Sequence, residues 1–214
     1  MKNYVITMQD VPQAKAMAER CVRSGSIHGV WIDYFTATTP NNSDIYKMLK
    51  EEGISALGFE EVYSRLDNCI SAFLSHYRIW KLAVETNTSV TIFEHDAVIK
   101  APIQPVPFNM CLNIGKPSYG KFNTPQSLGV GPLVSKRYFG GAHAYQLTAR
   151  GANVLVTQAR QFARPTDVFL HLDTFPHLEE MYPWPVEVDD SFSTIQKTEG
   201  CLAKHNYGDG YEII

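Results

Sequence analysis

The sequence predicts an α/β fold, with a mostly parallel central sheet flanked by helices, in a single domain over residues 1–214. Strand-like and helix-like segments alternate through the first half of the chain, and this alternation is typical of parallel sheets. The composition, with 44% hydrophobic and 19% charged residues, is that of a globular chain and excludes disordered, collagen-like and coiled-coil proteins. A length of 214 residues supports one sizeable core, whereas two independent cores would be cramped.

Periodicity defines the first elements. In chain order they are a strand over 4–8, a helix from 12 to about 24, a strand over 30–35 and a helix over 43–52. Asp10 is in position to cap the first helix, and Pro12 suits an early helical position. The apolar residues of this helix recur at intervals of three and four, which predicts one buried face.

The remaining elements are less regular. We expect a long helix over 68–86, a buried strand over 90–93, a strand over 109–114, a strand over 143–147 and a helix over 148–162 that stops at 165–167. The last fifty residues show little periodicity. The segment 100–141 is rich in proline and glycine, so it is either a surface loop or a lid over a site, and its Lys116 and Lys121 would suit an anionic ligand.

Charge is distributed unevenly along the chain, whose net charge is −3. Residues 97–166 carry eight basic and no acidic side chains, whereas residues 167–214 carry two basic and ten acidic ones. If the basic side chains cluster, they form a positive surface for an anionic ligand. The alternative is that the two segments fold together and neutralise each other.

An acidic pair follows the predicted strand over 90–93. In extended backbone the side chains of Glu94 and Asp96 point to one side of the strand and that of His95 points to the other. Two carboxylates suit Mg²⁺ or Mn²⁺, and open α/β sheets bind ligands at the carboxyl ends of their strands. The pair therefore predicts a divalent metal site, with two solvated acids as the alternative.

Several short motifs occur in a fixed order along nearly the whole chain. They are Phe35-Thr36-Ala37, Leu74-Ser75-His76 followed by Trp80, Glu94-His95-Asp96, Gly141-Ala142-His143-Ala144-Tyr145, Gly151-Ala152, Pro165-Thr166-Asp167 and Ser193-Thr194-Ile195. In order and spacing these motifs resemble those of glycosyltransferase family 25, which contains lipooligosaccharide and collagen-modifying enzymes.

The resemblance implies a GT-A-like nucleotide-sugar-binding fold, a nucleotide-sugar donor such as a UDP-sugar, a bound Mn²⁺ or Mg²⁺, and transfer with inversion at the anomeric carbon. It implies that Glu94 and Asp96 hold the metal and the donor diphosphate, and that Asp167 faces the reaction centre. The residues that it places near the donor are Phe35, Ala37, Ser75 and His76.

Three positions depart from the family pattern. His95 stands where the family has an acid, Thr7-Met8 replaces an Asn-Leu pair, and Lys15 is the counterpart of an arginine early in the first helix. The loss of one carboxylate at His95 keeps open a non-catalytic module that binds a nucleotide or another anion.

The chemistry of sugar transfer needs two further groups. A cation must stabilise the charge on the leaving diphosphate, and a base must take the proton of the acceptor hydroxyl. We expect Asp167 to be the base, with Asp173 as second choice, although a cap after Pro165 explains Asp167 equally well. His171 is a candidate third metal ligand.

The acceptor follows less directly from the sequence. A glycan or small-molecule hydroxyl is the first expectation, and the basic block also suits a nucleic acid, such as a hydroxymethylated base in DNA. A metal-dependent nuclease is less consistent with only two carboxylates. No run of 18 apolar residues and no Cys-x-x-Cys pair is present, so we expect a reduced, cytoplasmic protein.

Overall fold

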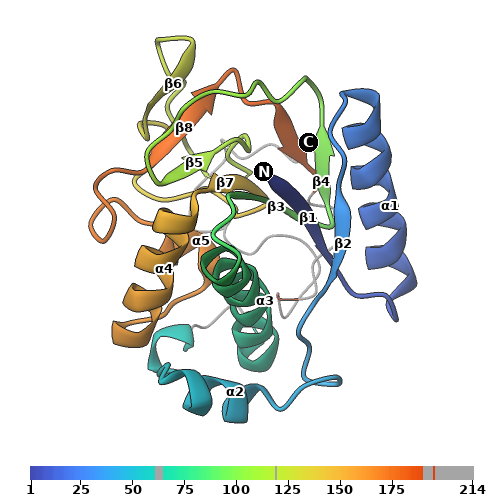
Figure 1. The fold of residues 1–214 in the computed structure, drawn as a ribbon, viewed down its shortest axis with the longest axis vertical. Helices are drawn as coiled ribbons and strands as arrows, with labels where there is room; N and C mark the ends of the chain where they lie inside the picture. Colours follow the sequence, from blue (N-terminus) through green and yellow to red (C-terminus); the bar gives the residue numbers. More distant parts are fainter. Residues whose placement is uncertain (61–64, 119, 190–194, 196–214) are drawn as a thin grey trace.

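The computed structural model describes residues 1–60, 65–118, 120–189 and 195. Its centre is a seven-stranded sheet in the order β2-β1-β3-β7-β5-β8-β6 (Figure 1). These strands are β1 (Lys2–Thr7), β2 (Asp33–Thr36), β3 (Val90–Glu94), β5 (Cys111–Asn113), β6 (Gly129–Pro132), β7 (Ala144–Leu147) and β8 (Glu179–Tyr182). A small second sheet pairs β4 (Ala97–Ile99) with β9 (Val186–Val188).

Strand directions show that the central sheet is mostly parallel. β1 pairs in parallel with both β2 and β3, and β5 pairs in parallel with β8. β7 runs antiparallel to its neighbours β3 and β5, and β6 runs antiparallel to β8. Five of the seven strands therefore point the same way, and the prediction of an α/β fold with a mostly parallel sheet is confirmed.

Helices cover both faces of the sheet. They are α1 (Pro12–Ile27), α2 (Ile45–Glu52), α3 (Leu66–Glu85), α4 (Ala149–Gln161) and α5 (Thr166–Phe169), with a 3₁₀ turn over Leu57–Phe59. Alternate strand residues enter two separate cores: Ile92 packs on the side of α3 and α4, and Phe93 packs on the side of α1. This alternation is what a sheet buried on both faces requires.

The first helix begins and ends differently from the prediction. Its N-cap residue is Val11, and no side chain caps it, so the expectation that Asp10 is the cap is wrong. The helix also continues through Gly25 to Ile27. Gly25 therefore does not end the helix; it is closely packed, since an added Cβ would lie 2.6 Å from Cδ1 of Ile32 and 3.0 Å from the carbonyl oxygen of Val30.

The second half of the chain contains elements that periodicity did not predict. β6 consists of two glycines, a valine and a proline, and β8 begins with two glutamates, so neither has a strand-like composition. The residues expected to stop α4 instead begin the single turn of α5. The predicted strand over 109–114 forms, but only over Cys111–Asn113.

The connections around β1 create a crevice at one edge of the sheet. From β1 the chain passes through α1, on one face, to β2; from β2 it passes through α2 and α3, on the other face, to β3 (Figure 1). β2 and β3 therefore lie on opposite sides of β1. In open α/β sheets such a reversal of strand order leaves a crevice at the carboxyl ends of the strands, where ligands bind.

Candidate functional site

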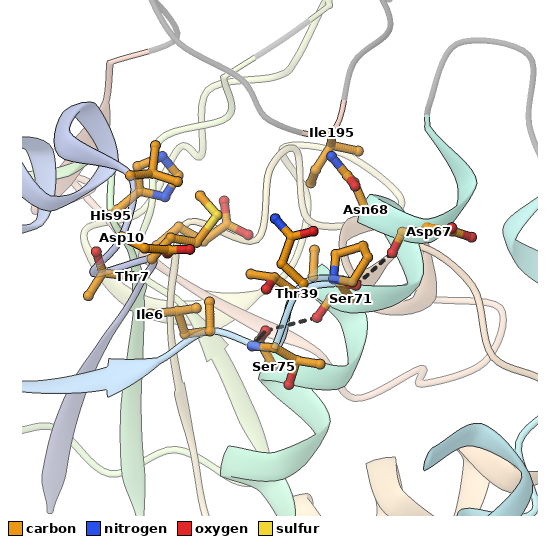
Figure 2. Close-up of a pocket in the computed structure, with 18 of the residues that line it drawn as sticks. Ile6, Thr7, Asp10, Thr39, Asp67, Asn68, Ser71, Ser75, His95 and Ile195 are labelled. Carbon is orange, nitrogen blue, oxygen red and sulfur yellow. Dashed lines mark hydrogen bonds between the residues drawn. The ribbon is translucent and has the colours of Figure 1, made fainter. Parts of the chain in front are cut away.

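A pocket of about 580 Å³, here called the strand-end pocket, lies where this reversal predicts a crevice. It is lined by the ends of β1 and β3, by the loops that follow β1, β2 and β3, and by the first half of α3 (Figure 2). Its polar and charged lining residues are Thr7, Asp10, Thr38, Thr39, Asn41, Arg65, Asp67, Asn68, Ser71, Ser75, His76, Glu94 and His95. The volume is in the range of small-molecule and cofactor sites.

Hydrogen bonds from α3 fix the loop after β2 at the wall of the pocket. The hydroxyl of Ser75 accepts from the backbone N–H of Thr38 at 2.9 Å and donates to the carbonyl of Ser71 at 2.8 Å (Figure 2). One turn further along, the guanidinium of Arg78 donates to the carbonyl of Thr36 and to the hydroxyl of Thr38. The pocket wall is therefore held by side chains that are already bonded within the protein.

Glu94 is the carboxylate of the acidic motif that reaches the pocket. It is the last residue of β3, and its side chain is 30% exposed, so a ligand can reach it. Its Oε1 lies 3.1 Å from Nε2 of His76, and Nδ1 of His76 lies 2.9 Å from the hydroxyl of Tyr145. Burial raises the pKa of Glu94, but the hydrogen bond from His76 lowers it, and on balance the pKa is lower than usual.

Asp96 does not share the pocket with Glu94. His95 and Asp96 form a tight turn between β3 and β4, so the extended backbone assumed from the sequence ends at Glu94. Asp96 is only 9% exposed, its charge contributes to the raised pKa of Cys21 on α1, and its carbonyl accepts from the N–H of Asp189. The expectation that Glu94 and Asp96 point to one side is corrected: Glu94 and His95 line the pocket.

His143, the residue before β7, lies beside Glu94. Its carbonyl accepts from the N–H of Glu94 at 2.9 Å, and its imidazole is buried with no hydrogen-bond partner for either ring nitrogen among the described residues. Burial lowers the pKa of His143 to about 4, with a smaller opposing effect from Glu94. The ring is enclosed by Gly115 and Gly141, where an added Cβ would lie 2.3 Å and 2.9 Å from its nitrogens.

The carboxylate of Glu94 has the chemistry of a ligand for a divalent cation. Mg²⁺ is commonly held by one or two carboxylates together with water and substrate phosphate, and Glu94 can supply one. Within the described ranges, no group of three or more His, Cys, Asp or Glu side chains is arranged to hold a metal. A metal bound here would therefore depend on oxygen atoms of the substrate.

Asp167, Asp173 and His171 lie outside the strand-end pocket. Asp167 is in α5, where its carboxylate accepts from the N–H of Val168 at 2.9 Å. Asp173 is exposed and forms an ion pair with Arg137, and its backbone N–H donates to Nδ1 of His171 at 3.0 Å. His171 lines a different hollow. The structure does not bring the predicted base or the predicted third metal ligand into the pocket that contains Glu94.

Of the residues that the family resemblance places near the donor, some line the strand-end pocket and others do not. Ala37, Ser75 and His76 line the strand-end pocket, although the polar atoms of Ser75 and His76 are bonded to protein groups. Phe35 lines a separate hollow, under the guanidinium of Arg78 at 4.8 Å. Lys15 is exposed on α1 and does not line the pocket.

The basic block is partly neutralised. Lys116 pairs with Glu187 at 3.6 Å, Arg160 pairs with Glu52 at 3.4 Å, and Arg137 pairs with Asp173. Lys121 lines the same separate hollow as His171. No residue of 97–166 lines the strand-end pocket as far as the described chain shows, so neither the predicted lid nor a positive surface at this pocket is observed there.

Several pocket residues were not predicted as site residues. Asp10 was taken for a helix cap, and Arg65, Asp67 and Asn68 stand at the start of α3 without a motif that marks them. They could have been predicted only from their positions in the fold. The loop after β1 and the start of the helix before β3 meet at the carboxyl edge of a parallel sheet. In the late motif Ser193-Thr194-Ile195, Ile195 lines the pocket and the other two residues lie outside the described residues.

A family model described as glycosyltransferase family 25 (LPS biosynthesis protein) matches residues 1–113, which include β1, β2, α3, β3 and most of the strand-end pocket. The chain belongs to this family, and the sequence-based assignment to a family of transferases is confirmed. The matched residues contain Glu94 and His76 but not Asp167. The family match therefore covers most of the pocket and not the predicted base.

Comparison with solved structures gives a distant likeness. A crystal structure of a glycosyltransferase involved in the glycosylation of the major capsid of PBCV-1 has a TM-score of 0.35 and 8% sequence identity, over 73% of this chain and 66% of that one. This chain therefore spans slightly less than two thirds of that structure's length. No curated protein matches the sequence. Over the residues described, no helix is both long and apolar enough to cross a membrane.

Proposed function

We propose that this chain transfers a sugar from a nucleotide-sugar donor to a hydroxyl group of a glycan or small-molecule acceptor, and that the nucleotide binds in the strand-end pocket. The observation that supports this most strongly is a pocket of nucleotide size at the carboxyl ends of β1, β2 and β3, with the carboxylate of Glu94 on its wall. The family description, LPS biosynthesis protein, supports a glycan as the acceptor.

The reaction we propose is one displacement with inversion. The acceptor oxygen forms a bond to the anomeric carbon while the bond to the diphosphate breaks on the opposite side, and the acceptor proton passes to a base. Mn²⁺ or Mg²⁺, when bound, supplies positive charge for the leaving diphosphate. Glu94 would hold this cation, and Arg65 is the one lysine or arginine among the described residues that line the pocket.

Three carboxylates are candidates for the base. Asp167 remains the residue implied by the family resemblance, whereas Asp10 and Asp67 are the other carboxylates that line the pocket. Asp67 already accepts from the hydroxyl of Tyr46 at 2.6 Å, and Asp10 is exposed. Comparison of Asp167→Asn with Asp10→Asn in one assay separates these two candidates. A base contributes roughly 10²–10⁴-fold to the rate, so the correct variant loses activity on that scale.

The test is release of nucleotide from UDP-, GDP-, ADP- and CMP-sugars, with Mn²⁺, with Mg²⁺ and with a chelator. We expect one donor to be consumed by the wild type and by Glu19→Gln, an ion-paired surface carboxylate on α1, but not by Glu94→Gln. Loss of activity with chelator would support the metal. Equal turnover by Glu94→Gln and wild type would contradict the role of Glu94.

Two alternatives from the sequence correspond to other results of this assay. Binding of a nucleotide without turnover, even with glycan acceptors present, would indicate the non-catalytic module. Transfer to a hydroxymethylated base would indicate a nucleic-acid acceptor. We do not propose the latter, because the basic block does not line the strand-end pocket and part of it pairs with acids of the same chain.

A further inference from the structure

Four side chains form an unbroken chain of hydrogen bonds that ends at the wall of the strand-end pocket. The indole N–H of Trp80 donates to the hydroxyl oxygen of Tyr145 at 2.8 Å. That hydroxyl lies 2.9 Å from Nδ1 of His76, and Nε2 of His76 lies 3.1 Å from Oε1 of Glu94. Trp80, Tyr145 and His76 are buried, and Glu94, whose side chain is 30% exposed, is the most accessible of the four.

Trp80 and Glu94, at the two ends of this hydrogen-bond network, determine in which direction its hydrogen bonds are donated. An indole nitrogen only donates, so Tyr145 accepts from Trp80 and its own proton is free to go to Nδ1 of His76. An ionised carboxylate only accepts, so Nε2 of His76 must carry the proton that bonds to Glu94. A neutral imidazole has one N–H. Donation from Tyr145 to Nδ1 and acceptance by Glu94 both place this proton on Nε2.

We propose that His76 is a positioning residue for Glu94: Trp80 and Tyr145 fix the tautomer in which His76 donates to Oε1, and this orients the carboxylate so that Oε2 remains for the ligand of the pocket. The ligand itself, a donor diphosphate with its cation, rests on the proposed function. Among the described residues, no protein group forms a hydrogen bond with Oε2 of Glu94. The network thus resembles the second layer of bonds that orients carboxylates and histidines in many binding sites.

The arrangement assigns His76 a role different from the one implied by the family resemblance. Both ring nitrogens of His76 are bonded to protein groups, so neither is available to a phosphate. The chain also connects three elements, since His76 is on α3, Tyr145 on β7 and Glu94 on β3. The position of the carboxylate is therefore tied to side chains that are packed in the core.

Direct observation of the tautomer is the first test. In protein labelled with ¹⁵N-histidine, we expect the NMR signals of His76 to show a proton on Nε2 and none on Nδ1. Tyr145→Phe removes the donor to Nδ1, so we expect a mixture of tautomers in that variant. Tyr77→Phe is the matched control, because Tyr77 is the next residue of α3 and its hydroxyl bonds to Glu52 instead. A wild-type protein protonated on Nδ1 would overturn the proposal.

Substitution of His76 tests the positioning role. Gln places an N–H donor near the position of Nε2, whereas Asn reaches only the position of Nδ1. We expect His76→Asn to lower kcat/KM for donor consumption by about tenfold or more, the cost of a lost hydrogen bond to a charged group, and His76→Gln to restore most of it. The ¹³C signal of the Glu94 carboxylate should shift in His76→Asn and stay near its wild-type position in His76→Gln.

The outcomes separate this proposal from the proposed function. If the wild type consumes no donor, the proposed function fails, and the histidine and carboxylate signals still decide the proposal. If both His76 variants keep the melting temperature of the wild type but move the Glu94 signal equally, positioning by a donated hydrogen bond is refuted. An unchanged Glu94 signal in His76→Asn refutes it as well.

Discussion

At the scale of single residues, the most constrained part of the site is the space around the imidazole of His143. Gly115 follows β5, and a Cβ at this position would lie 2.3 Å from Nε2 of His143, which is far closer than real Cβ contacts. The ring is buried and is closely packed on its other side as well, since a Cβ added at Gly141 would lie 2.9 Å from its Nδ1. The imidazole of His143 therefore leaves no room for a side chain at position 115.

We predict that Gly115→Ala destabilises the fold by about 1–3 kcal/mol, because it overpacks a filled core. Gly131→Ala in β6 is the control, since nothing lies within 4 Å of its added Cβ and its backbone is not in the left-handed region. Urea unfolding of both variants measures the difference. The double variant Gly115→Ala, His143→Ala should recover part of the loss, and equal stability of the two single variants would contradict the steric argument.

At the scale of elements, three helices are connected through one carboxylate. Glu52, the last residue of α2, accepts from the hydroxyl of Tyr77 and the ammonium of Lys81 on α3, and it pairs with Arg160 on α4. Partial burial raises the pKa of Glu52, but the hydrogen bonds from Lys81 and Tyr77 outweigh it, so its pKa is below the usual value. Burial raises the pKa of Tyr77 to about 12, and the bond to Glu52 adds to this effect.

We predict that Glu52→Gln lowers the free energy of unfolding at pH 7 by about 1–2 kcal/mol, since one charged hydrogen-bond acceptor with three donors is lost. A carboxyl group whose pKa is lower in the folded state stabilises the fold above its ordinary pKa of 4.5, and this contribution is lost as the pH falls through the lowered value. The difference between the wild type and Glu52→Gln should therefore shrink below about pH 4.5.

The control for this prediction is Glu51→Gln. Its carboxylate is 63% exposed and pairs only loosely with Lys47 at 3.9 Å on the same helix, so we expect a change within about 0.5 kcal/mol at every pH. Denaturant unfolding between pH 3 and pH 7 measures both variants. If the difference in unfolding free energy between the wild type and Glu52→Gln grew as the pH fell, the lowered pKa of Glu52 would be contradicted.

The elements also show what the sequence could and could not predict. The buried faces of α1, α3 and α4 follow the apolar spacing, because long amphipathic helices repeat one pattern many times. The short strands β6, β8 and β9 could not be predicted, because their pairing is decided by distant segments. Glu94 was found because a buried strand precedes it. The turn at His95 and Asp96 was missed, because nothing local marks the end of β3.

At the scale of the whole molecule, the strand-end pocket joins residues that are distant along the chain. Asp10 from the β1–α1 loop, Asn41 from the loop after β2, Arg65 at the start of α3 and Glu94 at the end of β3 meet only when the three parallel strands are ordered around β1. The pocket is thus a product of topology, and no single segment forms it. A ligand that fills it should therefore stabilise the folded protein as a whole.

We predict that one of UDP, GDP, ADP and CMP raises the melting temperature of the protein. A ligand at 100 times its Kd adds about 2.7 kcal/mol, which corresponds to roughly 5–10 °C for a chain of this length. Ala72→Phe places a ring in the pocket from α3 and should abolish the shift. Ala16→Phe, on the exposed side of α1, should keep it. A shift that persists in Ala72→Phe would mean that the nucleotide binds elsewhere. If none of the four nucleotides shifts the melting temperature of the wild type, the pocket does not bind a nucleotide in the absence of other ligands.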